Sequence, residues 1–183
     1  MNRTEALAEL KKHITNKNLL KHMLAVEAVM RRLARHFDQD EELWGLAGLL
    51  HDIDYAETAE DPARHSLVGG EMLAELGLPE ELIHAVKAHN DYHGISRESL
   101  MDKALYSSDP VTGLIVAGAL IRPEKSLAAV DVPFLMNRFH EKSFARGANR
   151  LQIEACVDMD LELDHFLQLS LEAMQGIAKE LGL

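Results

Sequence analysis

The chain has 183 residues, of which 47% are hydrophobic and 27% charged, and its formal net charge is −11 with histidines neutral. This length suits one domain with a substantial core, and the apolar fraction excludes an intrinsically disordered chain. The negative charge disfavours a protein that coats nucleic acid, because phosphate contacts need clustered Lys and Arg. A small phosphorylated ligand remains compatible with it, since a bound metal supplies local positive charge.

The single cysteine, Cys156, excludes an intramolecular disulfide and a cysteine-based zinc site, which suits a reducing compartment. The first residues lack the apolar stretch of a signal peptide, and we expect no window to approach a membrane span. The sequence therefore predicts a cytoplasmic protein without membrane contact.

Apolar residues at helical spacing and the lack of β-branched alternation predict an all-α chain. We expect Thr4 to cap the first helix, Pro79 to begin its helix, and Asp109-Pro110 to separate or kink two helices. Segments 55–64 and 90–96 are predicted loops. With no linker or repeat, residues 1–183 are predicted to form one domain. The predicted helices cover residues 4–14, 19–36, 41–52, 65–76, 79–89, 99–108, 111–121, 133–144, 150–157 and 161–181.

Three histidines share the apolar faces of their predicted helices, namely His22, His65 and His89. His51 and Asp52 end the apolar helix 41–52, where a buried carboxylate must pair, take up a proton or meet a metal. A single inward histidine is more simply a satisfied core residue. Several neutral imidazoles and a carboxylate that converge from different helices are what a metal site in a helical bundle requires.

Asp109 has an alternative role, because it directly precedes Pro110. An aspartate followed by proline is a common helix start, with the aspartate as N-cap and the proline at the first helical position. Thr112 would then stand at the third position. On local chemistry alone, capping is the favoured interpretation of Asp109.

The set formed by His22, His51-Asp52 and Asp109 resembles the H…HD…D signature of the HD-domain metal-dependent phosphohydrolase superfamily. The resemblance extends to Leu-Leu-His-Asp-Ile at 49–53 and Asp-Pro-Val-Thr-Gly-Leu at 109–114, and covers about residues 18–122. It implies an all-α HD-domain helical bundle, with a C-terminal helical extension over about 123–183. It also implies that the four signature residues bind one divalent metal, which raises Asp109 above its capping role, although both roles can coexist.

His65 and His89 resemble the extra histidines of binuclear branches of that superfamily, in which Asp52 would bridge two ions. They begin and end consecutive predicted helices, so antiparallel packing would bring them to the same end of the pair. His84 is rotated about 140° from His89 and is expected to point away. Many binuclear members continue the HD pair with Ile-Gly-Lys, whereas this chain continues with Ile53-Asp54-Tyr55. Any role of that lysine cannot be carried over, so one or two ions are both open.

The implied reaction is hydrolysis of a nucleotide or another small phosphate ester through a metal-activated water. Asp52 would hold the metal, and Lys103 is the leading candidate to orient the phosphate. Asp54 is a candidate proton acceptor or partner of a metal-bound histidine, and a turn role suits it equally. The remaining cationic candidates are Arg122, Lys142, Arg146 and Arg150. For each of these and for Lys103, ordinary surface charge is the simpler explanation.

Two other classes of function stay open at this point. One is a regulatory HD module that binds a nucleotide or metal without turnover, and the other is a di-iron HD-type oxygenase. Fold alone does not choose among them. His and Asp ligands admit Mn, Fe, Zn, Ni, Co or Mg, and neither the substrate nor the oligomeric state follows from the sequence.

Overall fold

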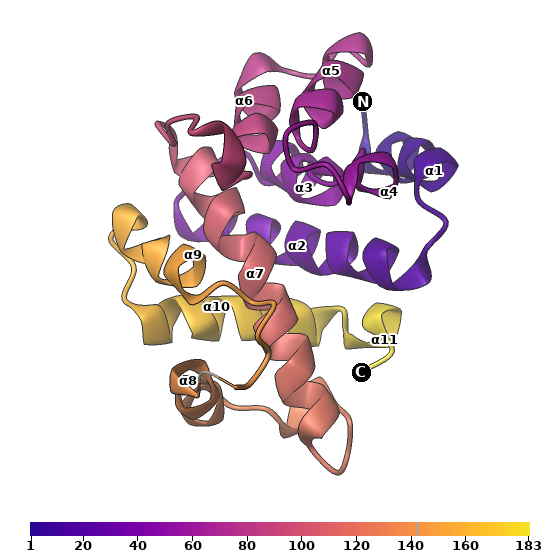
Figure 1. Ribbon diagram of the computed structural model, residues 1–183. Coiled ribbons are helices and arrows are strands. Elements are labelled where there is room, and N and C mark those ends of the chain that lie inside the picture. The colour runs from indigo at the N-terminus through magenta and orange to yellow at the C-terminus, as the bar shows by residue number, and fades with distance from the viewer. Residues whose placement is uncertain (142) are drawn as a thin grey trace.

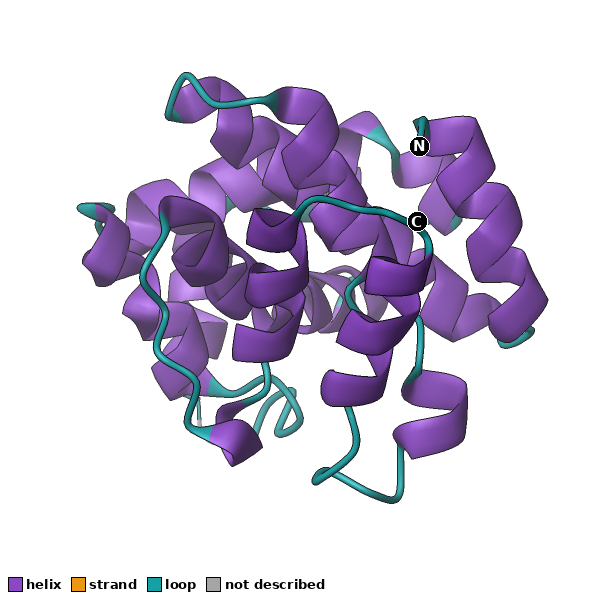
Figure 2. Cartoon of the chain, turned by 90° about the horizontal axis from the view of Figure 1, so that it is seen from above, coloured by secondary structure: helices purple, strands orange, loops and turns teal. Residues whose placement is uncertain are grey.

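The structure is a computed structural model that describes residues 1–141 and 143–183. Within these residues the regular elements are all helical and no strand occurs, as Figure 2 shows by its helices and connecting loops. The all-α prediction is confirmed. Lys142, one of the candidate cations, lies outside the described residues.

The N-terminal half follows the predicted helices with shifted boundaries, except that the predicted loop 55–64 begins with a short helix, α4 (Tyr55–Thr58). Asn2 rather than Thr4 caps the first helix, because its side chain accepts from the amide of Glu5 in a capping box. Pro79 is the N-cap of its helix rather than the first helical residue. Ser66 has a φ of 69°, so the helix expected from residue 65 begins after it. The helices are α1 (Arg3–His13), α2 (Lys17–His36), α3 (Glu41–Leu50), α4 (Tyr55–Thr58), α5 (Leu67–Glu75) and α6 (Glu80–Ala88).

The break expected at Asp109-Pro110 does not occur, because α7 runs without interruption over Leu100–Ile121. An interior proline removes a backbone hydrogen bond and costs about 3 kcal/mol. Burial offsets this cost, since Leu105 and Leu114 on either side of the proline are fully buried. The predicted separation into two helices is therefore wrong, and Asp109 is an interior helical residue rather than an N-cap.

The C-terminal extension is also helical. Arg150 is not a free cation there, because its guanidinium donates to backbone carbonyl oxygens that include those of Phe139, Phe144 and Ala148. It closes the turn before its helix, which contradicts a role in phosphate binding. The helices of the extension are α8 (Val132–His140), α9 (Arg150–Glu154), α10 (Leu163–Gly176) and α11 (Ala178–Leu181). Short 3-10 turns cover Leu127–Ala129 and Ala155–Met159 in the extension and Asp91–His93 before α7.

Helix α2 is the centre of the packing, with α3 on one side and α10 on the other, while α7 crosses α2 and α10 (Figure 1). Its inner face buries Met23, Val26, Met30 and Leu33 completely. The core is one cluster that includes residues of the extension such as Phe166. Helices α2, α3, α6 and α7 meet on one side of the molecule, and the polar residues described below lie where they meet.

Helix α7 is long and apolar enough, by length and composition alone, to cross a membrane. The expectation that no window approaches a span is therefore wrong. In the fold, 67% of its most apolar segment is buried against other helices. Such burial is what a central core helix requires, since its apolar surface is already removed from water.

Candidate metal centre

Asp52 lies at the centre of a cluster of imidazoles, just after the end of α3. His51 is the C-cap of that helix and keeps helical backbone angles, and residues 51–54 form a turn. The apolar periodicity of α3 buries this end, so His51 is fully buried and Asp52 is 7% exposed. The helix therefore places a histidine and a carboxylate in the core, where both need partners.

One oxygen of Asp52, Oδ2, faces two histidines. It lies 3.5 Å from Nε2 of His51 and 3.9 Å from Nε2 of His22 on α2. Asp109 of α7 completes this group, with its Oδ1 3.0 Å from His22 Nε2 and 3.9 Å from His51 Nε2. The four residues of the H…HD…D set, which are 87 positions apart at the extremes, thus form one compact group.

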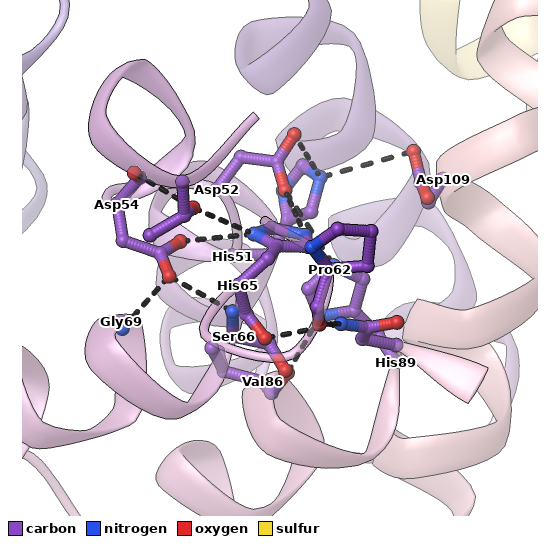
Figure 3. Close-up of polar contacts among 12 residues, drawn as sticks. His51, Asp52, Asp54, Pro62, His65, Ser66, Gly69, Val86, His89 and Asp109 are labelled. Carbon is purple, nitrogen blue, oxygen red and sulfur yellow. Dashed lines mark hydrogen bonds and ion pairs between the residues drawn. The ribbon is translucent and has the colours of Figure 1, made fainter. Parts of the chain in front are cut away.

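The other oxygen of Asp52, Oδ1, faces a second pair of histidines. It lies 3.4 Å from Nε2 of His65 and 3.5 Å from Nε2 of His89. Figure 3 shows these side chains around Asp52, with Asp109 opposite. Successive imidazole rings from His22 through His51 and His89 to His65 stand 5.2 Å apart between centroids. Asp52 therefore lies between two groups of candidate ligands and offers one oxygen to each.

Backbone carbonyls fix the orientation of the two most buried imidazoles. His51 Nδ1 is 2.9 Å from the carbonyl oxygen of Gly48, and His89 Nδ1 is 2.5 Å from that of Val86. A carbonyl oxygen only accepts, so each Nδ1 must carry the proton and donate it. Each Nε2 then keeps its lone pair when the ring is neutral, and that lone pair faces Asp52.

Asp54 orients His65 in the same way, by engaging its Nδ1 and leaving its Nε2 directed at Asp52. Its Oδ1 lies 3.2 Å from His65 Nδ1, and its Oδ2 accepts from the amides of Ser66 at 2.8 Å and Gly69 at 3.1 Å. These contacts also stabilise the strained positive φ of Ser66, which turns the chain into α5. Asp54 is fully buried with both oxygens engaged. Of the two chemical roles considered for it, the geometry favours that of partner to a ligand histidine.

Thr112 orients His22, a role that sequence reasoning missed. Its hydroxyl donates to the carbonyl oxygen of Asp109 at 2.9 Å and lies 3.1 Å from His22 Nδ1. With its only proton used, the hydroxyl accepts from His22 Nδ1, so His22 Nε2 keeps its lone pair. The signal available in the sequence was the position of Thr112 three residues after Asp109 in a helix.

The residues fit a divalent cation. Four Nε2 lone pairs and two carboxylates face each other at distances of 3.0 to 3.9 Å, and such an arrangement repels itself unless positive charge lies among them. Nε2 of His51 is buried with no hydrogen-bond partner among the described residues. Two groups in the cluster have ligand atoms close enough to hold an ion: His22, His51 and Asp109, and His51, Asp52 and His89.

Protons supply that positive charge when no metal does. Burial alone would lower the pKa of His89, but its hydrogen bond to Asp52 and the charge of that carboxylate raise it to about 9. Burial likewise opposes the charge of Asp52, yet the imidazoles of His51 and His89 outweigh it and hold the pKa of Asp52 below its usual range. Burial lowers the pKa of His51. The cluster thus holds its carboxylates ionised, as a metal site needs.

The remaining predicted residues lie elsewhere. His84 is 3.1 Å from Asp102 and points away from Asp52, as its helical position predicted. Lys103 is half-buried on α7, about 120° around the helix from Asp109, and no described contact joins its ammonium group to the cluster. Arg122 lies over the ring of Phe134 at the far end of α7. The part assigned to Lys103 stays a prediction.

Comparison with known proteins agrees with this geometry. The model of the HD domain family matches residues 19–129. The chain belongs to the HD domain family. The match and the all-helical structure confirm the fold and family inferred from the signature. Proteins of this family are generally metal-dependent hydrolases and bind divalent metals.

Relatives of this HD protein fall into two kinds. An uncharacterized protein of Methanocaldococcus jannaschii is 30% identical over 175 residues, which are 90% of this chain and 98% of that protein. Ribonuclease Y of Lawsonia intracellularis is 30% identical over 96 residues, and that of Nitratidesulfovibrio vulgaris is 34% identical over 76. These matches cover 18% and 15% of the ribonucleases, so the chain corresponds to less than a fifth of either. No solved structure is significantly similar.

Proposed function

We propose that this HD protein is a metal-dependent phosphohydrolase that acts on a nucleotide or another small phosphate ester. The observation that carries the proposal is the division of Asp52 between two sets of lone-pair donors. His22, His51, Asp52 Oδ2 and Asp109 would hold one ion, and Asp52 Oδ1, His65 and His89 a second. Such ions, when bound, lower the pKa of a water molecule and polarise a phosphoryl oxygen.

The protein residues orient this chemistry and limit access to it. His51 and His89 are 0% and 3% exposed, whereas the side chains of His22 and Asp109 are 25% and 30% exposed. The cluster is therefore closed on the α3 and α6 side and open where α2 meets α7. A phosphate group would reach the cluster from the side on which His22 and Asp109 are exposed.

A small substrate suits this site better than a polymer. The net charge of −11 repels a long phosphate backbone, and sequence-independent binding of nucleic acid depends on many Lys and Arg contacts. Several relatives carry the name ribonuclease Y, but the shared segment is a minor part of those proteins. RNA is therefore the competing substrate class, and it belongs in the same assay.

The test begins with elemental analysis of protein purified without added metal. The same sample is then assayed for phosphate release from a panel of nucleotides and small esters, with a single-stranded oligoribonucleotide beside them. We expect bound divalent metal and turnover of at least one small ester. The matched control is Asp52→Asn, which keeps the side-chain shape but removes the shared charge, and it should lose both metal and activity while staying helical by circular dichroism. A metal-loaded wild type that releases no phosphate would contradict the proposal.

A further inference from the structure

A cavity of about 440 Å³ lies next to the candidate metal centre, between α2 and α7. We call it the α2–α7 groove. Its wall on α2 includes His22, and its wall on α7 includes Thr112, Gly113, Val116 and Leu120. His22 therefore contributes to the groove and to the metal cluster, so that the two spaces share a boundary.

The α7 wall continues directly from the metal cluster. Asp109, Gly113, Val116 and Leu120 are spaced by four, three and four residues, so they share one face of the helix. Asp109 touches the cluster at one end, and Leu120 is about 16 Å away along the axis at a rise of about 1.5 Å per residue. A ligand that lies along this face would have one end at the cluster and the rest in the groove.

Gly113 keeps the beginning of the groove open. It stands one turn beyond Asp109 and is exposed, and a Cβ added to it would meet no atom within 4 Å. Glycine in the interior of a helix costs about 1 kcal/mol relative to alanine, and nothing here crowds against its backbone. The absent side chain leaves free space at the point where the groove meets the cluster.

The lining of the groove is predominantly apolar. Val116 and Leu120 form it on α7, Leu181 and Leu183 close it, and Leu120 is 50% exposed. Its polar residues are Asn18, Lys21 and His22 on α2 and Thr112 on α7, and the hydroxyl of Thr112 is already committed to Asp109 and His22. Buried polar groups without partners weaken binding, whereas burial of alkyl carbon strengthens it.

We propose that the α2–α7 groove binds the apolar portion of a phosphate monoester with a long alkyl chain, whose phosphoryl group lies at the metal centre. This inference rests on the proposed function and narrows its substrate class. The missing side chain of Gly113 leaves the groove open toward the metal centre, and Val116 and Leu120 determine how much of the alkyl chain of the ligand is buried. A nucleotide is the competing ligand.

The test uses methyl-, butyl- and octylphosphonic acid, which are not hydrolysed, bound to the metal-loaded full chain and followed by calorimetry. We expect affinity to rise about 100-fold from the methyl to the octyl compound, as burial of several methylenes predicts. Gly113→Phe should remove most of this gain. Leu120→Glu should weaken the octyl compound about tenfold and leave the methyl compound unchanged. Gly176→Phe is the matched control, because Gly176 is also a helical glycine with no atom within 4 Å of an added Cβ.

Equal affinities for the methyl and octyl compounds, or a gain that survives in Gly113→Phe, would overturn the inference. Tighter binding of a nucleoside monophosphate than of octylphosphonic acid would overturn it as well, in favour of a nucleotide site. Turnover of octyl phosphate is measured separately. A chain-length gain without turnover would contradict only the proposed function, and turnover of small esters without the gain would contradict only the groove.

Discussion

The hydroxyl of Thr112 on α7 lies 3.1 Å from Nδ1 of His22 on α2, 90 residues away in sequence. It completes a pattern in which each of the four cluster histidines has its Nδ1 engaged and its Nε2 directed at a carboxylate. Partners of this kind orient metal ligands and fix their tautomers. They also make specific predictions for residues that would not touch an ion.

Thr112→Val should weaken metal binding by about 10- to 100-fold, the usual effect of losing a partner to a ligand histidine. Valine keeps the shape of a side chain that is 1% exposed, so the helix should remain folded. Thr112→Ser retains the hydroxyl and should restore most of the affinity. Competition with a chelator measures the affinity, and urea unfolding of the metal-free proteins checks the fold. Equal weakening in the serine and valine variants would assign Thr112 a packing role only.

Asp109→Asn tests the charge of the α7 carboxylate. Because Asp109 is inside the helix, no capping function compensates for or masks the change. Asparagine keeps the shape of the side chain but lacks the negative charge of Asp109, whose Oδ1 lies 3.0 Å from Nε2 of His22. We expect sharply weaker metal binding and a drop of orders of magnitude in phosphate release. Metal affinity equal to that of the wild type would remove Asp109 from the ligand set.

Because the two carboxylate oxygens of Asp52 face different pairs of histidines, we predict two ions per chain. Elemental analysis after loading with excess manganese or iron should give about two ions for the wild type and about one for His65→Ala or His89→Ala. His84→Ala is the matched control and should keep two, because His84 contacts Asp102 instead. One ion in the wild type that neither variant changes would leave only the site of His22, His51, Asp52 and Asp109.

The raised pKa of His89 predicts a pH dependence of the metal-free protein. The imidazole titrates near 6.5 when unfolded and at about 9 when folded. A raised folded pKa stabilises the fold fully below pH 6.5, and the effect is lost as the pH rises to about 9. Its size is on the order of 3 kcal/mol. Urea unfolding at pH 6 and pH 9 measures it after treatment with a chelator.

In the same experiment His89→Gln should lose this contribution, whereas His84→Gln should keep it. Bound metal needs neutral imidazole, so metal-loaded wild type should not become less stable by this route as the pH rises. If the stability of metal-free His89→Gln fell by the same amount between pH 6 and pH 9, the effect would come from another group.

Local sequence determined the helices and most of the ligand candidates. The apolar stripes of α2 and α6 define which face each helix buries, and so periodicity alone assigns His22 and His89 to the interior, while His51 follows from its place at the end of the apolar helix α3. His65, assigned to the apolar face of a helix, lies before α5 instead. The spacing of His84 from His89 likewise predicted that it would point away. These features depend on helical periodicity, which neighbouring residues specify by themselves.

Only the tertiary structure decided what α7 does and how the ligands are oriented. Local chemistry favours a helix start at Asp109-Pro110, but burial of the apolar residues around it outweighs the cost of the proline and keeps α7 continuous. The pairing of Thr112 with His22, and the division of Asp52 between two pairs of histidines, join helices that are distant in sequence. No periodic pattern encodes such contacts, because they depend on the packing of one helix against another.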